Sequence, residues 1–163
     1  MEACARCGAE LPPGARFCAS CGAQVGDDEP DGRERKLATV LFADLVGSTA
    51  LGGSQDPERT RALLERFYDA AADEVERAGG TVEKFAGDAV MAAFGAPAAL
   101  EDHAERCLHA AVGMRARVRA LDRRLELRVG VNTGDVVVGR PREGSSFVTG
   151  DAVNVAARLE QGA

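Results

Sequence analysis

Four of the five cysteines in this 163-residue chain lie within its first 21 residues, in two similar segments. The segments are Cys4-Ala-Arg-Cys7-Gly8 and Cys18-Ala-Ser-Cys21-Gly22, and ten residues (8–17) lie between the two cysteine pairs. The glycine after each second cysteine can adopt positive φ and close a tight turn with both thiolates on one side. Two such turns can surround one tetrahedral Zn²⁺ with four sulfur atoms.

Disulfides and redox dithiols account for these cysteines less well than zinc does. The odd count argues against a secreted disulfide framework, and a pair of redox dithiols does not explain a motif duplicated at this spacing. Residues 1–25 are therefore predicted to form a zinc ribbon with one structural Zn²⁺. We expect this module to fold only with its metal, because it contains few apolar residues.

The residues that follow differ in composition. Residues 26–35 are charged and are interrupted by Pro30 and Gly32, which predicts a solvated linker. A domain is then predicted over 36–163.

Overall composition limits the class of protein. The formal net charge is -6, which argues against a general nucleic-acid-binding surface. No apolar stretch approaches the roughly 20 residues of a membrane-spanning helix, and the N-terminus lacks the apolar segment of a signal peptide. We therefore expect no membrane partner and a cytoplasmic location.

The first strand and helix of the larger domain are marked by composition. The apolar run 39–43 predicts a buried strand that stops at Asp44. The segment 56–80 opens with Asp-Pro, continues with apolar residues at helical spacing and closes with Gly-Gly, which predicts one amphipathic helix.

Further elements follow in a regular order. Residues 81–85 and 89–94 flank a short turn, which predicts a β-hairpin with Asp88 near its tip. The apolar spacing of 102–121 predicts a second helix, and that of 125–131 predicts a strand with one buried face.

The last part of the chain predicts a turn at 132–135, a strand at 136–138 and a helix that starts at Asp151. This order indicates an α+β sandwich with helices packed on one face of a mainly antiparallel sheet. A split βαβ, ferredoxin-like core fits it best.

Two aspartates stand out within this pattern. Asp44 follows a buried strand and Asp88 lies at a hairpin tip, and carboxylates from neighbouring strand ends suit Mg²⁺, which fills its coordination shell with phosphate oxygens. Either aspartate alone is more often a turn residue. Small residues follow Asp44, and their backbone N–H groups could face a phosphate: Leu45, Val46, Gly47, Ser48 and Thr49.

The remaining reactive side chains are assigned no role in catalysis or binding. His103 and His109 lie on the second helix, away from every motif, and are interpreted as ordinary helix positions. Cys107 lies on the apolar stripe of the same helix and is interpreted as a small core residue.

Four stretches resemble class III adenylyl and guanylyl cyclases, in order and at similar spacing. The stretch 39–49 resembles the first metal-binding segment of that family, and Glu83-Lys-Phe-Ala-Gly-Asp88 resembles its second. The stretch 149–160 resembles the helix that binds ribose and the transition state, and 128–134 matches a core strand. The resemblance extends from about Arg35 to the last residue.

The resemblance implies roles for single residues. Asp44 and Asp88, with the backbone carbonyl of Leu45, correspond to ligands of two Mg²⁺ or Mn²⁺ ions. Lys84 corresponds to a purine-reading residue, where lysine accompanies adenine and an acidic residue accompanies guanine. Asn154 corresponds to the residue that orients the ribose, and Arg158 to the one that stabilises charge on the reacting phosphate.

The implied activity is conversion of ATP to 3′,5′-cyclic AMP and pyrophosphate in intracellular signalling. The family's active sites are shared between two chains, so a homodimer is implied. The domain is also expected to continue beyond Ala163, with further domains downstream. Nothing indicates the partner of the zinc ribbon.

One position departs from the family pattern. Many members have Asp or Thr as a second base-reading residue where this chain has Phe147, which offers no hydrogen bond. Ser146 or Thr149 would have to replace that contact, unless the alignment shifts in the loop that contains 144–146. Three alternatives remain open: a guanylyl cyclase, a catalytically silent nucleotide-binding domain, and a zinc-ribbon protein that binds another macromolecule.

Overall fold

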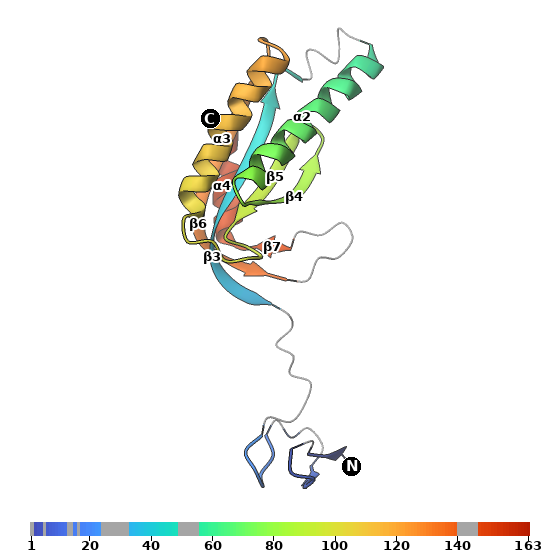
Figure 1. Cartoon of the computed structure of the whole chain (residues 1–163), viewed down its shortest axis with the longest axis vertical. Helices are drawn as coiled ribbons and strands as arrows, with labels where there is room; N and C mark the ends of the chain where they lie inside the picture. Colours follow the sequence, from blue (N-terminus) through green and yellow to red (C-terminus); the bar gives the residue numbers. More distant parts are fainter. Residues whose placement is uncertain are drawn as a thin grey trace. The chain divides into compact units, whose positions relative to one another are not determined.

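A computed structural model describes residues 2–4, 6–12, 15, 17–23, 33–48, 56–139 and 147–163 of the chain. The chain divides into two compact units, Met1–Arg33 and Glu34–Ala163. Figure 1 shows the elements of each unit. The predicted linker residues 26–32 lie outside the described residues.

The first unit contains one small antiparallel sheet. Strand β1 (Glu2–Ala3) pairs with β2 (Glu10–Leu11). Its small buried cluster consists of Cys4, Leu11 and Cys18. Two of these three residues are cysteines, so this unit has little apolar surface to bury.

The second unit is built on a five-stranded antiparallel sheet. Its strands are β3 (Glu34–Val46), β4 (Thr81–Ala86), β5 (Ala89–Phe94), β6 (Glu126–Val138) and β7 (Val148–Thr149). Their spatial order is β4-β5-β3-β6-β7. The first four of these strands have the order of a split βαβ core, so the predicted ferredoxin-like fold class is confirmed.

Two helices cover one face of the sheet. Helix α2 (Pro57–Arg77) begins at Asp56, whose side chain accepts a hydrogen bond from the backbone N–H of Glu58 at 3.2 Å. Helix α3 (His103–Leu121) lies beside it. Their apolar stripes pack on odd-numbered residues of β3, among them Leu41 and Leu45, to form the larger core cluster. Within the described residues, no helix has both the length and the apolar composition needed to span a membrane.

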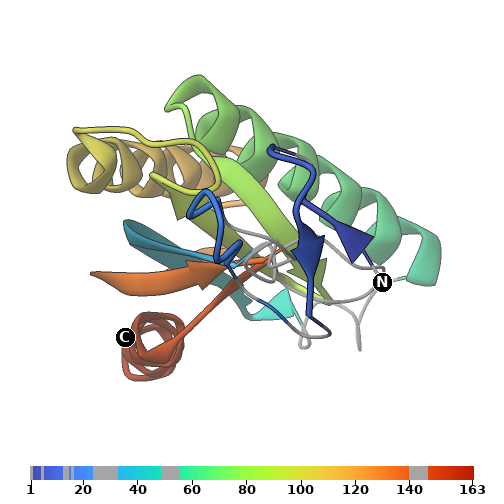
Figure 2. The ribbon, with the colours of Figure 1, turned by 90° about the horizontal axis from the view of Figure 1, so that it is seen from below.

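A third helix covers the opposite face, so the prediction that all helices pack on one face is wrong. Helix α4 (Asp151–Gln161) lies across the sheet from α2 and α3 (Figure 2). It packs on even-numbered residues of β3, such as Ala38 and Val40, in a second core cluster. The sequence predicts this helix, but the face of the sheet that it covers depends on how the chain connects β6, β7 and α4.

Close approach of α4 to β6 depends on two glycines. A Cβ at Gly130 would overlap the backbone of Ala156 and Glu160, and one at Gly134 would lie 2.9 Å from the Ala152 Cβ. Glycine has no side chain to prevent this contact. The segment 128–134 therefore provides the surface on which α4 rests.

A predicted turn and both predicted limits of the first strand differ from the structure. No turn interrupts 132–135, because β6 pairs without a break with β3 from Glu126 to Val138. The long partner strand holds these turn-forming residues extended, and the Asn132 side chain donates to the Ala152 carbonyl of α4 at 3.1 Å instead. Strand β3 also does not stop at Asp44 but continues to Val46, and its start at Glu34 includes the last two residues of the predicted linker.

We predict that Gly130→Ala lowers the free energy of unfolding of the second unit by about 1–3 kcal/mol, because α4 must move away from β6 to admit the methyl group. Chemical denaturation followed by circular dichroism would measure the change. Gly139→Ala is the matched control, since a Cβ there has nothing within 4 Å. Equal stability of the two variants would contradict the packing argument.

Candidate active site and zinc-binding site

The four N-terminal cysteines lie together. All four Sγ atoms are within 4.8 Å of one another, and the Cys4–Cys21 and Cys7–Cys18 Sγ pairs are 3.7 and 3.6 Å apart. These distances are too long for a disulfide, which needs about 2.05 Å. Four sulfurs at the usual Zn–S distance of about 2.3 Å would be separated by about 3.8 Å. The donor set and its spacing therefore fit a tetrahedral zinc ion.

The two cysteine turns share one backbone geometry. The N–H of Gly8 donates to the Cys4 carbonyl at 2.8 Å, and the N–H of Gly22 donates to the Cys18 carbonyl at 2.8 Å. Both glycines have positive φ, 75° and 68°. The duplicated sequence thus forms two matching turns, as the spacing predicted.

The turn backbone also favours the thiolate form of one cysteine. Hydrogen bonds from the backbone N–H groups of Arg6 and Cys7 lower the pKa of Cys4 to about 6. Zinc binds thiolates rather than thiols, so this turn favours the metal-binding form of Cys4. In the same cluster the backbone hydrogen bond from Ala23 is outweighed by the Cys7 side chain and burial, which raise the pKa of Cys21 to about 12.

The two candidate metal aspartates are joined through the backbone. Strand β3 pairs with β5 so that Asp44 lies opposite Ala89, the residue after Asp88. The N–H of Leu45 donates to the Asp88 carbonyl at 3.1 Å. This bond fixes the hairpin tip beside β3, and the two carboxylates are close enough that Asp88 raises the pKa of Asp44.

The residues directly after β3 also contact this site. The Ser48 hydroxyl donates a hydrogen bond to Oδ2 of Asp88, and it lies 3.5 Å from the Leu45 carbonyl oxygen. Gly47 has a φ of 87°, in the left-handed region that favours glycine, directly after the exposed end of the strand at Val46. Thr49, the last residue predicted for this turn, lies outside the described residues.

A basic residue to which the sequence analysis assigned no role contacts Asp44. Arg128 of β6 lies directly opposite Asp44 in the sheet, and its Nη2 donates to Oδ2 of Asp44 at 2.7 Å. Burial is the main cause of the raised pKa of Asp44, and the hydrogen bond from Arg128 opposes it. Without this guanidinium, two neighbouring carboxylates would repel each other more strongly.

Glu160 of α4 completes the charged cluster. Its Oε1 lies 3.3 Å from Nε of Arg128, and the residue is 9% exposed. Burial raises its pKa, while Arg128 opposes that shift. The sequence held a signal for this residue, because Glu160 continues the buried four-residue spacing of Ala152 and Ala156 along α4.

The other predicted site residues are not brought to the aspartates within one chain. Asn154 and Arg158 are both exposed, two positions along α4 from the buried residues Ala152 and Ala156. At 100° per residue that offset places them on the outer face of the helix. Lys84 is exposed on β4. Within one chain, Asn154 and Arg158 therefore face away from the aspartates.

Phe147 does not have the environment of a base-reading residue. Its side chain packs against the core cluster between the sheet and α4. Its backbone N–H donates to Oε1 of Glu83 at 2.5 Å, and its carbonyl accepts from the N–H of Gly139 at 2.8 Å. Thr149 directs its hydroxyl toward the Val137 carbonyl at 3.5 Å, and Ser146 lies outside the described residues.

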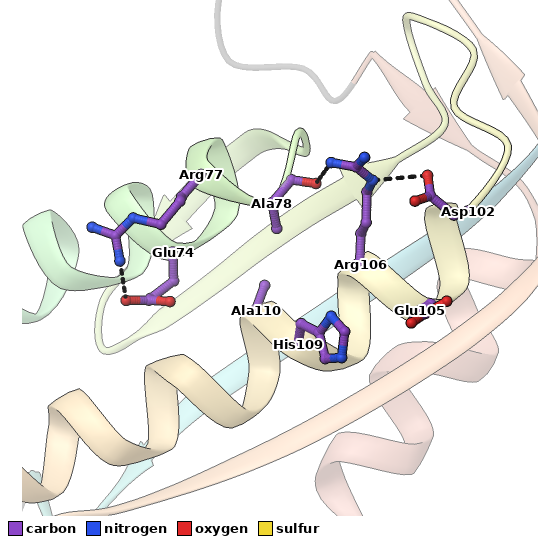
Figure 3. A pocket seen from close by; sticks show the side chains of 8 residues that line it. All are labelled: Glu74, Arg77, Ala78, Asp102, Glu105, Arg106, His109 and Ala110. Carbon is purple, nitrogen blue, oxygen red and sulfur yellow. Dashed lines mark hydrogen bonds and ion pairs between the residues drawn. The ribbon is translucent and has the colours of Figure 1, made fainter.

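A pocket of about 370 Å³ lies between the end of α2 and the start of α3 (Figure 3). Its arginines already have partners: Arg77 pairs with Glu74 at 3.2 Å, and Arg106 pairs with Asp102 at 2.8 Å. None of the predicted site residues lines it. His109 does line it, whereas Nδ1 of His103 lies 2.7 Å from the Thr39 hydroxyl in the sheet.

Comparison with known families agrees with this geometry. Residues 33–163 match the adenylate and guanylate cyclase catalytic domain, and residues 4–25 match a zinc-ribbon domain. The chain therefore belongs to the adenylate and guanylate cyclase catalytic domain family and carries a zinc ribbon at its N-terminus.

Individual relatives and structures place the domain within this family. An uncharacterized protein of Mycobacterium tuberculosis is 38% identical over 131 residues, which cover 78% of this chain and 24% of that protein. The chain thus spans about a quarter of the length of such curated relatives.

Two solved structures are similar to the second unit. The adenylyl cyclase CyaB from P. aeruginosa has a TM-score of 0.73 and 31% identity, over 80% of this chain and 74% of that one. The guanylyl cyclase Cya2 has a TM-score of 0.72 and 33% identity, over 80% of this chain and 72% of that one. Fold similarity alone does not distinguish the two purine substrates.

The thiol cluster predicts that the chain binds zinc and that Cys7→Ser weakens this binding, because a serine hydroxyl is a poor replacement for a thiolate. Metal analysis of the purified protein and a competition titration with a chelator would measure the loss. Cys107→Ala is the control, since this fifth cysteine is buried in the core of the second unit. Equal zinc loss in both variants would contradict a site made by the N-terminal cysteines.

Proposed function

We propose that the second unit is an adenylate cyclase that converts ATP to 3′,5′-cyclic AMP and pyrophosphate, with two Mg²⁺ or Mn²⁺ ions in each active site. The observation that carries the proposal is the pairing of Asp44 with Asp88, fixed by the 3.1 Å hydrogen bond from the Leu45 N–H to the Asp88 carbonyl. We also propose that the N-terminal unit holds one structural Zn²⁺ and acts as an accessory module.

The donor set suits such ions. Two carboxylates and the Leu45 carbonyl are hard oxygen donors, the kind that Mg²⁺ and Mn²⁺ prefer. In metal-free form the Asp44 carboxylate already binds a cation, the Arg128 guanidinium, at 2.7 Å. Divalent ions at these oxygens would lower the pKa of the ribose 3′-hydroxyl and neutralise the triphosphate.

The protein's own groups would orient the substrate. Backbone N–H groups of the turn that contains Val46, Gly47 and Ser48 would face the phosphates. The sequence predicts the same role for Thr49. Arg158 would stabilise the charge that develops as the 3′-oxygen attacks the α-phosphorus, and Asn154 would hold the ribose in line for that attack. Lys84 would donate a hydrogen bond to the adenine edge.

These roles require a second copy of the chain. Asn154 and Arg158 lie on the outer face of α4, whereas Asp44 lies on the sheet face that α4 covers. In a two-fold dimer, the metal aspartates of one chain can meet the lysine, asparagine and arginine of its partner. We therefore propose a homodimer with two composite active sites.

Two residues bear on the purine preference. Lys84 favours adenine, but Phe147 is half-buried against the core cluster and its side chain offers no hydrogen bond to the base. The presence of Phe147 at this position also favours a second candidate function, a nucleotide-binding domain that does not catalyse cyclisation.

The first test is product formation from ATP and from GTP with Mn²⁺. We expect cyclic AMP from the unaltered chain, and a loss of about 100-fold or more in Asp88→Ala, because metal contacts contribute several kcal/mol to the transition state. Asp69→Ala, at an exposed aspartate of α2, is the matched control and should retain activity.

Other products would redirect the proposal. Cyclic GMP alone would assign the domain as a guanylate cyclase. Absence of both products, from a folded dimer that binds ATP, would support the silent nucleotide-binding domain.

The composite site can be tested by mixing two inactive variants. Asp44→Ala and Arg158→Ala each damage both sites of their own homodimer, but a mixed dimer has one intact site. After exchange of subunits at equal concentrations, about a quarter of the unaltered activity should return, since half of the dimers are mixed and each has one working site. A mixture no more active than its components would contradict the shared site.

A further inference from the structure

Arg128 connects the candidate metal site to helix α4. Its Nη2 lies 2.7 Å from Oδ2 of Asp44 on β3, and its Nε lies 3.3 Å from Oε1 of Glu160 on α4. One guanidinium therefore contacts two carboxylates that come from different elements. The sheet register fixes this position, because Asp44 and Arg128 are direct partners between β3 and β6.

The two contacts differ in quality. The contact with Asp44 is a short hydrogen bond between charged groups, which is the stronger kind. The contact with Glu160 has no hydrogen-bond geometry, and among the described residues neither Nε of Arg128 nor Oε1 of Glu160 has a hydrogen-bond partner. A buried carboxylate is costly unless it is paired and hydrogen-bonded. Glu160 thus has capacity for a closer contact with Arg128.

A metal ion bound to Asp44 would compete with the guanidinium of Arg128 for the same carboxylate. Asp88, Asp44 and Glu160 all act on Arg128 electrostatically. A divalent ion on the Asp44 carboxylate would meet the guanidinium on the same group, and two cations there repel each other. Arg128 would be drawn toward Glu160, whose negative charge is already within 3.3 Å.

We propose that Arg128 is a positioning residue that holds the Asp44 carboxylate in place in the absence of metal, and that Glu160 accepts the guanidinium when a divalent ion binds. This inference rests on the proposed function only in assigning a divalent ion to Asp44. It gives Glu160 a role at the site although its carboxylate would not contact substrate or metal.

The test is a Mn²⁺ titration of the zinc-loaded full chain without nucleotide, followed by the electron paramagnetic resonance signal of free Mn²⁺. Removing the competing cation in Arg128→Met should tighten Mn²⁺ binding by about fivefold, the size expected for partly exposed charges. Glu160→Gln should weaken it by about fivefold, because the guanidinium then remains on Asp44. In the double variant the effect of Glu160→Gln should disappear, because there is no guanidinium to accept.

Controls separate this arrangement from general effects. Arg117→Gln removes an arginine that bridges α2 and α3 through Asp73 and Glu74, and it should leave Mn²⁺ affinity unchanged. Asp44→Ala gives the baseline without the site. Thermal unfolding of each zinc-loaded variant before Mn²⁺ is added shows whether a loss of affinity comes from loss of the folded state.

Each result has a definite meaning. Opposite changes in the two single variants together with a non-additive double variant would support the proposal. Additive changes would show that Arg128 and Glu160 act only through their separate charges, and this would overturn it. Absence of Mn²⁺ binding by the unaltered chain would instead overturn the metal site and thus the proposed function.

Discussion

The antiparallel pairing of β3 with β6 is the constraint on which the rest of the second unit depends. Over thirteen residues it places Asp44 opposite Arg128 and keeps the odd-numbered positions of β3 facing α2 and α3. Even-numbered positions, Asp44 among them, face the side that α4 covers. Because side chains alternate with period two, a slip of one residue would turn Asp44 into the core under α2 and α3. The register therefore determines the site as well as the sheet.

The candidate site also depends on helix α4. Its inner face packs on the sheet, and its outer face carries two predicted site residues. The inner face carries Ala152, Ala156 and Glu160, and the missing side chains of Gly130 and Gly134 let it approach β6 closely. The outer face carries Asn154 and Arg158, directed away from the aspartates of the same chain. This separation is the physical basis of the proposed shared active site, because Asn154 and Arg158 face away from the aspartates of their own chain.

The N-terminal unit is stabilised in a different way from the second unit. Its buried cluster contains Cys4, Leu11 and Cys18, so apolar burial provides little free energy. Four thiols within 4.8 Å of one another supply a metal site in its place. The two units thus fold for separate reasons.

Sequence alone determined those features that depend on short stretches of chain. Matching glycine turns placed the four cysteines, apolar spacing located α2 and α3, and the turn at residues 86–88 located the hairpin that presents Asp88. These features are local, because cap, turn and period signals act over a few residues. Family resemblance then selected Asp44, Lys84, Asn154 and Arg158 as candidates.

Tertiary structure alone decided the features that join distant segments. Residues 132–135 have the composition of a turn, yet they are extended because the long partner strand β3 satisfies their backbone. The side of the sheet that α4 covers likewise depends on contacts between separate segments. Arg128 contacts Asp44 and Glu160, which are 84 and 32 residues away in the chain. Periodicity shows which face of an element is apolar, but it carries no information about which distant element covers that face. That choice is made only when the whole sheet has formed.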